Sequence, residues 1–286
     1  MHFLVVSSQL SNKTARMGIE KKEIDMKKKS LVLLLVMAMI AAFCFSACGS
    51  SDSAEEFKTE GELLCVTEAT FPPFDTTDDD GNIAGFDMDL ISAIAEDQGF
   101  TVTFKDIGFD SLIPALKAKE ADIITAGMNS LDEERQAKVD FCTPYYDSGL
   151  VVLVKEDNKD INSVDDLTAD MKVASQIGTT GADEANALVE DGKIAEAVIL
   201  DKFSDVVLQV KNGDVAAAII DLPVAKNYIA KQPGVVKMVG ETMNAEAYAF
   251  AVQKGNSVLQ EKINAGYQNV LDKGIVDELK AKWEMD

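Results

Sequence analysis

The sequence predicts an α/β fold made of two similar lobes, and three observations lead to this prediction. Apolar segments of strand length alternate with segments of helical periodicity, an order typical of parallel sheets covered by helices. The order helix, short turn, aspartate and apolar strand occurs twice, in LKAKEADIITAG around Asp122 and in LQVKNGDVAAAIID around Asp214. Two further apolar runs, SGLVVLVKED and AYAFAVQKG, have the extended character expected of segments that cross between lobes. Independent βα units of similar design are the alternative explanation for the repeat.

The first lobe is predicted to begin with a strand. Its apolar run breaks at Pro72–Pro73, because proline cannot continue a strand ladder. A helix follows, in which apolar residues recur at helical spacing, and Gly99 is expected to end it. The predicted elements are strands at 63–66, 101–107 and 121–126 and helices at 86–94 and 109–116.

The second lobe repeats this order. Its predicted elements are strands at 172–178, 196–200 and 216–220, a helix from about 182 and another at 206–210. We expect residues 151–245 to form this lobe and residues 61–150 plus 246–286 to form the first. The chain would then cross between the lobes twice.

The N-terminal segment has the pattern of an export signal. Three lysines, Lys27 to Lys29, precede a short apolar stretch at 31–45, which is shorter than the roughly 20 residues that span a membrane. FSAC at its end resembles the bacterial lipobox, whose cysteine, here Cys48, becomes the lipidated first residue. We expect 1–47 to be an upstream extension and a lipoprotein signal peptide, and 48–60 a flexible tether on the extracellular face of the cell membrane. An uncleaved anchor is the alternative.

Charge and composition exclude several classes of function. The formal net charge of −22 makes nucleic acid an improbable partner. The one histidine, His2, lies in the segment expected to be removed. The exported protein would therefore hold no Ser-His-Asp or Cys-His catalytic group and no histidine-ligated metal. We expect neither a metal nor a cofactor.

Two cysteines, Cys65 and Cys142, lie outside the signal segment and its lipobox, both in apolar, strand-like surroundings. Two buried free thiols are the preferred interpretation, and one disulfide is the alternative in an exported protein. Open α/β sheets bind ligands at the carboxyl ends of their strands. We therefore expect function to lie in the loops that directly follow the predicted strands.

Motifs in those loops resemble the polar amino-acid solute-binding proteins of bacterial ABC transporters, the extracellular solute-binding proteins of family 3. The resemblance covers residues 60–286 and is carried, in order, by TEATFPPF, GFDMDL, LIPALKAKEADI, AGMNSLDEER, VDFCTPYY, GTTG and AAAIIDLPVA. It implies a periplasmic-binding-protein-like fold of type II, with two parallel-sheet lobes joined by two hinge strands. It further implies a monomer that binds a free amino acid between the lobes and delivers it to a permease, without catalysis.

The resemblance assigns one charged residue of each lobe to the amino-acid head group. Arg135 would grip the α-carboxylate, since a guanidinium meets a carboxylate with two parallel hydrogen bonds. Asp221 would pair with the α-ammonium, because a buried ammonium needs an anionic partner. The alternatives are a surface arginine that pairs with Glu133 or Glu134, and an aspartate that caps the following helix.

Two loops complete the expected head-group site. Gly127 and either Asn129 or Ser130 would supply hydrogen bonds from the first lobe. The spacing from Gly127 to Arg135 is one residue longer than in relatives, so the choice between Asn129 and Ser130 stays open. In the second lobe Thr179 and Thr180 precede a helix, whose backbone N–H groups favour an anion. Turn and helix-capping roles are the alternatives for both loops.

Three residues are assigned by resemblance to the ligand side chain. Phe71 would cover it, Glu68 would contact it, and Gln176 would face it from the second lobe. A carboxylate at this position favours a basic or amide-bearing amino acid over an aliphatic one.

Two other functions are compatible with the same fold. A dehydratase of the cyclohexadienyl type, which acts on prephenate and arogenate, would need an acid or base in the cleft. Without histidine, Glu68 and Asp221 are the candidates. A ligand-sensing domain would be followed by a membrane helix and a signalling region. We expect a binding protein and not an enzyme.

Overall fold

The structure is a computed structural model that describes residue 59 and residues 61–285. The chain divides into two compact units, 1–53 and 54–286, and the described residues belong to the second. The signal peptide, Cys48 and all of the tether except Thr59 lie outside the described residues. Within those residues, no helix combines the length and the apolar character that a membrane span requires.

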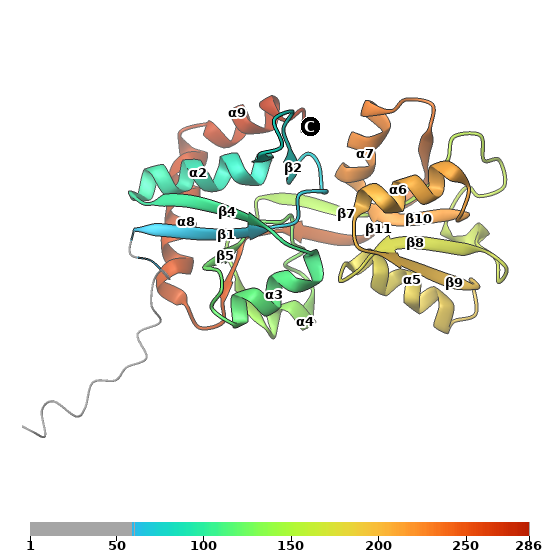
Figure 1. Cartoon of the computed structure of the whole chain (residues 1–286), viewed down its shortest axis with the longest axis horizontal. Coiled ribbons are helices and arrows are strands. Elements are labelled where there is room, and N and C mark those ends of the chain that lie inside the picture. The colour runs from blue at the N-terminus through green and yellow to red at the C-terminus, as the bar shows by residue number, and fades with distance from the viewer. Residues whose placement is uncertain (1–58, 60, 286) are drawn as a thin grey trace, which may run out of the picture. The chain divides into compact units, whose positions relative to one another are not determined.

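A five-stranded sheet forms the centre of the first lobe, in the order β4-β1-β5-β12-β6 (Figure 1). Strand β1 pairs in parallel with β4 and β5, whereas β12 pairs antiparallel with β5 and β6. The predicted parallel sheet is therefore confirmed for three strands, and the two others make the sheet mixed. The bounds are β1 Glu62–Thr67, β4 Thr101–Asp106, β5 Ile123–Ile124, β6 Val139–Phe141 and β12 Ala251–Gln253.

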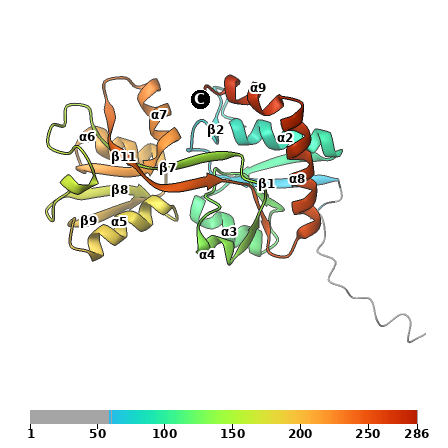
Figure 2. The ribbon, with the colours of Figure 1, turned by 180° about the vertical axis from the view of Figure 1, so that it is seen from behind.

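Helices cover both faces of this sheet (Figures 1 and 2). Helices α2 (Phe86–Gln98), α8 (Ser257–Asp272) and α9 (Ile275–Lys282) pack together over one face, and α3 (Phe109–Lys117) covers the other. The apolar residues of α2 recur at helical spacing, which buries them against the sheet. Gly99 ends α2 in the left-handed conformation, with φ of 79°, as the sequence predicts. A short hairpin, β2 (Thr76–Thr77) and β3 (Ile83–Ala84), and the short helix α4 (Glu133–Gln136) complete this lobe.

The second lobe has its own five-stranded sheet, in the order β11-β7-β10-β8-β9. Strands β10, β8 and β9 are parallel, and β7 and β11 are antiparallel to their neighbours. The helices surround this sheet, as Figure 1 shows. The bounds are β8 Lys172–Gln176, β9 Glu196–Leu200, β10 Ala217–Asp221, the 3-10 turn Val164–Asp166, α5 Thr180–Glu190, α6 Phe203–Asn212 and α7 Leu222–Lys231.

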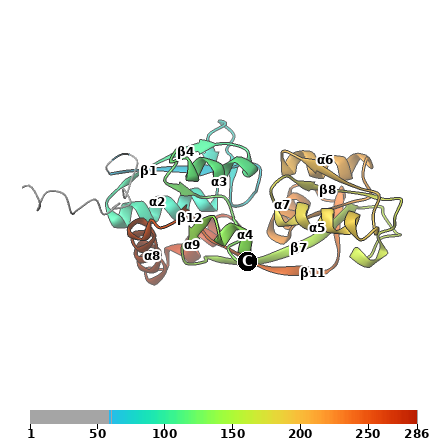
Figure 3. The same ribbon diagram turned by 90° about the horizontal axis from the view of Figure 1, so that it is seen from below.

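Two long antiparallel strands, β7 (Tyr146–Lys155) and β11 (Val236–Tyr248), connect the lobes (Figure 3). The first agrees with the expected crossing segment, but the second begins well before the run AYAFAVQKG. Strand β11 lies at the edge of the second-lobe sheet, next to β7, and many of its side chains are partly or fully exposed. It therefore carries polar residues and lacks the apolar run that the prediction relied on.

Aromatic side chains fill the junction between the first lobe and the connecting strands. The ring of Phe74 lies 5.1 Å from that of Tyr248 and 5.1 Å from that of Tyr146, both edge-on. Phe71 stands 5.8 Å from Tyr248 on the same cluster. This packing fixes the loop after β1 against the start and end of the two crossing strands.

Both cysteines in the described part of the chain are buried free thiols, Cys65 on β1 and Cys142 just after β6. Burial raises the pKa of both, that of Cys142 to about 12. A thiol that stays protonated is a poor nucleophile, so these residues act as core side chains.

Candidate functional site

Loops from the carboxyl ends of the strands meet between the lobes around a small cavity. Its volume is ≈ 10 Å³, enough for about one water molecule. The walls come from both lobes: Phe71, Phe109, Gly127, Asn129, Arg135, Thr179, Thr180, Phe203 and Asp221. Seven of these nine residues are among those that the sequence singled out. The remaining predicted residues, Glu68, Gln176 and Ser130, are buried beside the cavity without lining it.

Arg135 points from α4 into the space between the lobes. Its backbone N–H donates to the helix-capping carboxylate of Asp132, at 2.9 Å, which fixes the start of this short helix. The guanidinium is buried, lies 5.5 Å from the centroid of the Phe109 ring, and donates across the cleft to the carbonyl of Gly178 at 3.1 Å. Its nearest acidic group is Asp132, at 3.8 Å, and neither of the neighbouring glutamates pairs with it. The arrangement is that of a cation held in the cleft and not of a surface arginine.

Asp221 ends β10 in the second lobe and faces the same cavity. It occupies the N-cap position of α7, yet its side chain makes no capping hydrogen bond. One carboxylate oxygen instead accepts a hydrogen bond of 2.6 Å from the hydroxyl of Tyr248. Burial raises the pKa of Asp221, and the charge of Arg135 acts against this shift. The helix-capping alternative is therefore wrong for the side chain of Asp221.

The loop after β5 passes directly against Phe71. Gly127 has φ of +51°, and a Cβ placed there would lie 2.4 Å from the Phe71 ring, so a larger residue does not fit. Its backbone N–H donates to Asp87 at 2.9 Å, and the same carboxylate oxygen accepts from the hydroxyl of Tyr145. Burial raises the pKa of Asp87 to about 7. Asp87, the first aspartate of the motif GFDMDL, thus fixes the position of the loop that follows β5.

The two residues between which the sequence left a choice occupy different places. Asn129 lines the cavity, and its side-chain oxygen accepts from the backbone N–H groups of Leu131 and Ala247, at 3.0 and 3.3 Å. The hydroxyl of Ser130 points to β11, where it donates to the carbonyl of Ala247 at 2.7 Å. Both side chains therefore tie this loop to the second connecting strand, and Asn129 is the one exposed to the cavity.

The second lobe presents the N-terminus of α5 to the cavity. Thr179 caps this helix, since its hydroxyl oxygen accepts from the N–H of Ala182 at 3.2 Å. Thr180 is the first residue of the helix, and its hydroxyl donates to the carboxylate of Glu246. The partial positive charge of a helix N-terminus favours an anion here.

Glu68 and Gln176 meet across the cleft. The amide nitrogen of Gln176 donates to the Glu68 carboxylate at 3.0 Å, and the hydroxyl of Thr70 donates to the same carboxylate. The amide oxygen of Gln176 is buried, and no described residue donates a hydrogen bond to it. Burial raises the pKa of Glu68. These side chains hold the lobes together next to the cavity and retain one unused acceptor.

Four residues of this region escaped the prediction from sequence. Phe109 and Phe203 line the cavity from the starts of α3 and α6, and Glu246 and Tyr248 lie behind it on β11. Phe109 and Phe203 directly follow strands, so the strand-end rule contained the signal for them. Nothing local distinguishes Glu246, because which face of an edge strand is buried depends on the rest of the fold.

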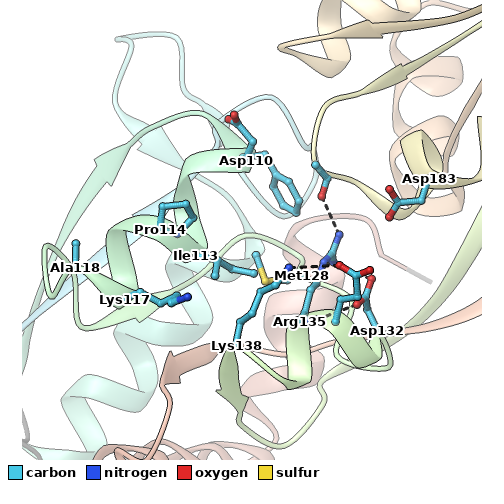
Figure 4. Close-up of a pocket in the computed structure, with 13 residues that line it drawn as sticks. Asp110, Ile113, Pro114, Lys117, Ala118, Met128, Asp132, Arg135, Lys138 and Asp183 are labelled. Atoms are coloured by element: carbon cyan, nitrogen blue, oxygen red, sulfur yellow. Dashed lines mark hydrogen bonds and ion pairs between the residues drawn. The ribbon is translucent and has the colours of Figure 1, made fainter. Parts of the chain in front are cut away.

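A wider pocket of ≈ 700 Å³ opens beside the small cavity, and Arg135 belongs to the walls of both (Figure 4). Phe109, Ile113 and Met128 supply its apolar wall, and Lys138 and Asp183 lie at its polar side. Within the part of the chain that the structure describes, no group of three or more His, Cys, Asp or Glu side chains is placed to hold a metal ion.

Comparisons with known proteins agree with this geometry. The sequence profile of the bacterial extracellular solute-binding proteins, family 3, matches residues 63–286. The arginine-binding extracellular protein ArtP of Bacillus subtilis is 33% identical over 253 residues, covering 88% of this chain and 96% of ArtP. The structure of an ancestral arginine-binding protein bound to arginine aligns with a TM-score of 0.74 and 41% identity, over 78% of this chain and 98% of that one. A second structure, of an ancestral arginine-binding protein bound to glutamine, aligns at 0.73 and 40%, over 80% of this chain and 100% of that one.

Proposed function

Because the chain belongs to the bacterial extracellular solute-binding proteins of family 3, we propose that it captures a basic or amide-bearing amino acid in its cleft. It then delivers this amino acid to the permease of an ABC importer. The observation that carries the proposal is a pair of buried, opposite charges, Arg135 and Asp221, which face one cavity from opposite lobes. A free α-amino acid carries the complementary pair, a carboxylate and an ammonium.

The proposed binding step exchanges contacts between the lobes for contacts with the ligand. A cavity of ≈ 10 Å³ is too small for an amino acid, so the lobes must part to admit one. The α-carboxylate would then bind the guanidinium of Arg135, which in this structure donates to the carbonyl of Gly178. The same carboxylate would also bind the N-terminus of α5. The ammonium would take Asp221. Since the ligand would contact both lobes at once, it binds the closed arrangement more tightly than the open one.

The proposed side-chain subsite explains why a basic or amide-bearing ligand is favoured. Glu68 supplies a carboxylate and Gln176 a buried amide oxygen with no donor among the described residues, and both are acceptors for N–H groups. Phe71 and Phe203 stand with their ring centroids 5.3 Å apart at the cavity wall, a surface on which a planar guanidinium or amide packs well. An aliphatic side chain would leave the buried amide oxygen of Gln176 without a donor and the charge of Glu68 without a cationic partner.

A thermal-shift panel of amino acids tests the proposal directly. The purified protein, refolded to remove carried-over ligand, is heated with each of the twenty amino acids, ornithine, citrulline and cystine. Ligand at a hundredfold excess over Kd stabilises the native state by about 2.7 kcal/mol, which raises Tm by roughly 5–10 °C in a protein of this size. We expect this shift from arginine, lysine, ornithine, histidine or glutamine and none from aliphatic amino acids. A flat response to the whole panel, or turnover of prephenate, would refute the proposal.

Two amino acids of this panel, L-arginine and L-glutamine, test the role of Glu68 through the variant Glu68→Gln. The substitution keeps the shape of the side chain and removes its charge, so a cationic ligand loses a charge-assisted hydrogen bond of about 1.5–3 kcal/mol. We expect the affinity for L-arginine, measured by calorimetry, to fall roughly 10- to 100-fold, and that for L-glutamine to change far less. Glu96→Gln, on the exposed side of α2, is the matched control. Equal losses for both ligands would place Glu68 outside the side-chain subsite.

We further propose that the protein is a monomer anchored to the outer face of the membrane by a lipid on Cys48. The motif FSAC supports the anchor, and an extracellular relative such as ArtP supports the compartment. Fractionation of cells checks this proposal. We expect wild type in the membrane fraction and Cys48→Ala absent from the mature membrane-bound pool. Unchanged membrane attachment of the variant would show that another segment holds the protein.

A further inference from the structure

Two buried carboxyl groups of the connecting region face each other beside the cavity. Asp221 and Glu246 are only 6% and 3% exposed, and their side chains are in hydrogen-bond contact. Asp221 lines the cavity itself. Glu246 contacts two further residues of the cavity wall, because one of its oxygens accepts from the hydroxyl of Thr180 and from the amide of Asn129, the latter at 3.3 Å. Glu246 therefore belongs to the wall of the proposed head-group site.

The second oxygen of Glu246 has no donor. It is buried, and none of the residues that the structure describes donates a hydrogen bond to it. The hydroxyl of Tyr248, the nearest phenol, is directed to Asp221 at 2.6 Å. A buried acceptor without a donor is costly, and an acid proton between the two carboxyl groups would supply the missing donor.

The surrounding charges do not neutralise two carboxylates. The titratable and charged groups that face Glu246 from the described elements are Asp221 at the end of β10, Tyr248 on its own strand and Arg135 on α4. Arg135 is the one cation among them, and its guanidinium also lies near Asp132, at 3.8 Å. Two carboxylates in contact at a site of low dielectric cannot both stay ionised without a second cation. Burial, reinforced by the charge of Asp221, raises the pKa of Glu246 to about 9.

We propose that Glu246 is a second acidic residue of the ammonium subsite, which shares one proton with Asp221 before the ligand binds and releases it to solvent when the ligand ammonium takes its place. This inference rests on the proposed function and adds a residue and a proton to it. The step is balanced: one carboxyl O–H bond breaks, its proton leaves as a hydrated proton, and the ammonium N–H groups replace it as donors. The ligand class that this subsite selects is a primary ammonium and not a neutral hydroxyl.

The release of a proton makes binding depend on pH with a defined sign. Burial and the charge of Asp221 raise the pKa of Glu246, so the pair holds a proton at neutral pH before binding, whereas the proposed complex holds none. A rise in pH therefore favours the complex. Affinity should therefore increase between pH 6 and 8, by at most about tenfold per pH unit for a single proton. In Glu246→Gln the amide donates permanently to Asp221, no proton is released, and this dependence disappears.

Calorimetry with L-arginine as the probe tests the ligand step. At pH 7, the binding enthalpy is compared in phosphate and Tris, whose heats of ionisation differ. We expect a buffer-dependent enthalpy that corresponds to the release of up to one proton in wild type, and none in Glu246→Gln. We also expect wild type, but not Glu246→Gln, to bind more tightly at pH 8 than at pH 6, by roughly 10- to 100-fold. Glu241→Gln, an exposed position on the same strand, is the matched control and should behave as wild type. A buffer-independent enthalpy in wild type would overturn the inference.

Infrared spectroscopy without any ligand tests the shared proton separately. We expect the C=O stretch of a protonated carboxyl group at pH 7 in wild type and in Glu241→Gln, and its loss in the difference spectrum of Glu246→Gln. An unchanged spectrum in Glu246→Gln would refute the shared proton even if amino acids bind. If neither L-arginine nor any other amino acid of the thermal-shift panel bound, the proposed function and the ammonium step would both fail, while the infrared result would still decide whether the pair shares a proton.

Discussion

We expect Arg135→Ala to bind no α-amino acid at concentrations that saturate the wild-type protein. The substitution removes the buried cation that faces the cavity from the first lobe, and with it both hydrogen bonds to the ligand carboxylate. Each charge-assisted bond contributes about 1.5–3 kcal/mol, so the loss is at least about 3 kcal/mol, or more than about a hundredfold in Kd. The loss should be equal for every ligand of the panel, because all of them share the carboxylate. Isothermal titration calorimetry measures it.

Lys138→Ala is the matched control for this prediction. Lys138 belongs to the wall of the wider pocket and is half-exposed, and it pairs at the surface with Glu134 at 3.4 Å. Lys138→Ala removes one positive charge, as Arg135→Ala does, but Lys138 does not line the small cavity. We expect its affinity to stay within about threefold of wild type, since surface ion pairs contribute little. If Arg135→Ala bound amino acids normally, the head-group assignment would be wrong.

Asp221→Asn separates ligand binding from stability. The variant removes one of the two acidic partners proposed for the ligand ammonium, and with it a charge-assisted hydrogen bond of about 1.5–3 kcal/mol, or roughly 10- to 100-fold in Kd. The same substitution does not lower the stability of the protein without ligand. Burial raises the pKa of Asp221, so the carboxylate is disfavoured in the native state, and a neutral amide avoids this cost. We therefore expect weaker binding together with a Tm, measured without ligand, that is equal to or higher than that of wild type.

The capping position of Asp221 gives no reason to expect a loss of stability in this variant. The structure contains no capping bond from the Asp221 side chain, and asparagine is as favourable as aspartate at an N-cap. Tyr248 can still donate to the amide oxygen in the variant. Asp214→Asn, in the exposed turn before β10, is the matched control and should bind as wild type. A variant at Asp221 with a clearly lower Tm and intact affinity would assign this residue a structural role.

Local sequence patterns predicted most of the secondary structure because both lobes follow short-range rules. Strands β1, β8 and β10 lie where apolar runs end at proline or polar residues, and Gly99 ends α2 as a left-handed cap. The prediction fails where a strand buries only one of its two faces. Strand β11 starts earlier than predicted because an edge strand needs no continuous apolar run.

In the cleft, too, the residues found from the sequence are those that lie in recognisable local motifs. Arg135 and Asp221 were identified by resemblance, because each lies in a short family motif, AGMNSLDEER and AAAIIDLPVA. Glu246 was not identified, because it lies inside a strand that carries no motif. Its burial and its contacts with Asp221 and Thr180 follow from the way β11 passes behind both lobes.

The sequence by itself determined the two α/β lobes, the family and the residues that carry the charges of the cleft. These properties depend on periodicity, turn chemistry and short motifs, all of which are local. The tertiary structure alone decided which side chains share the cavity, which carboxyl groups face each other, and that Asn129 rather than Ser130 reaches the cavity wall. Such pairings join residues that are far apart in the sequence, as Asn129 and Glu246 are, at 117 positions. Their energies depend on burial and on neighbouring charges, which exist only once the chain has folded.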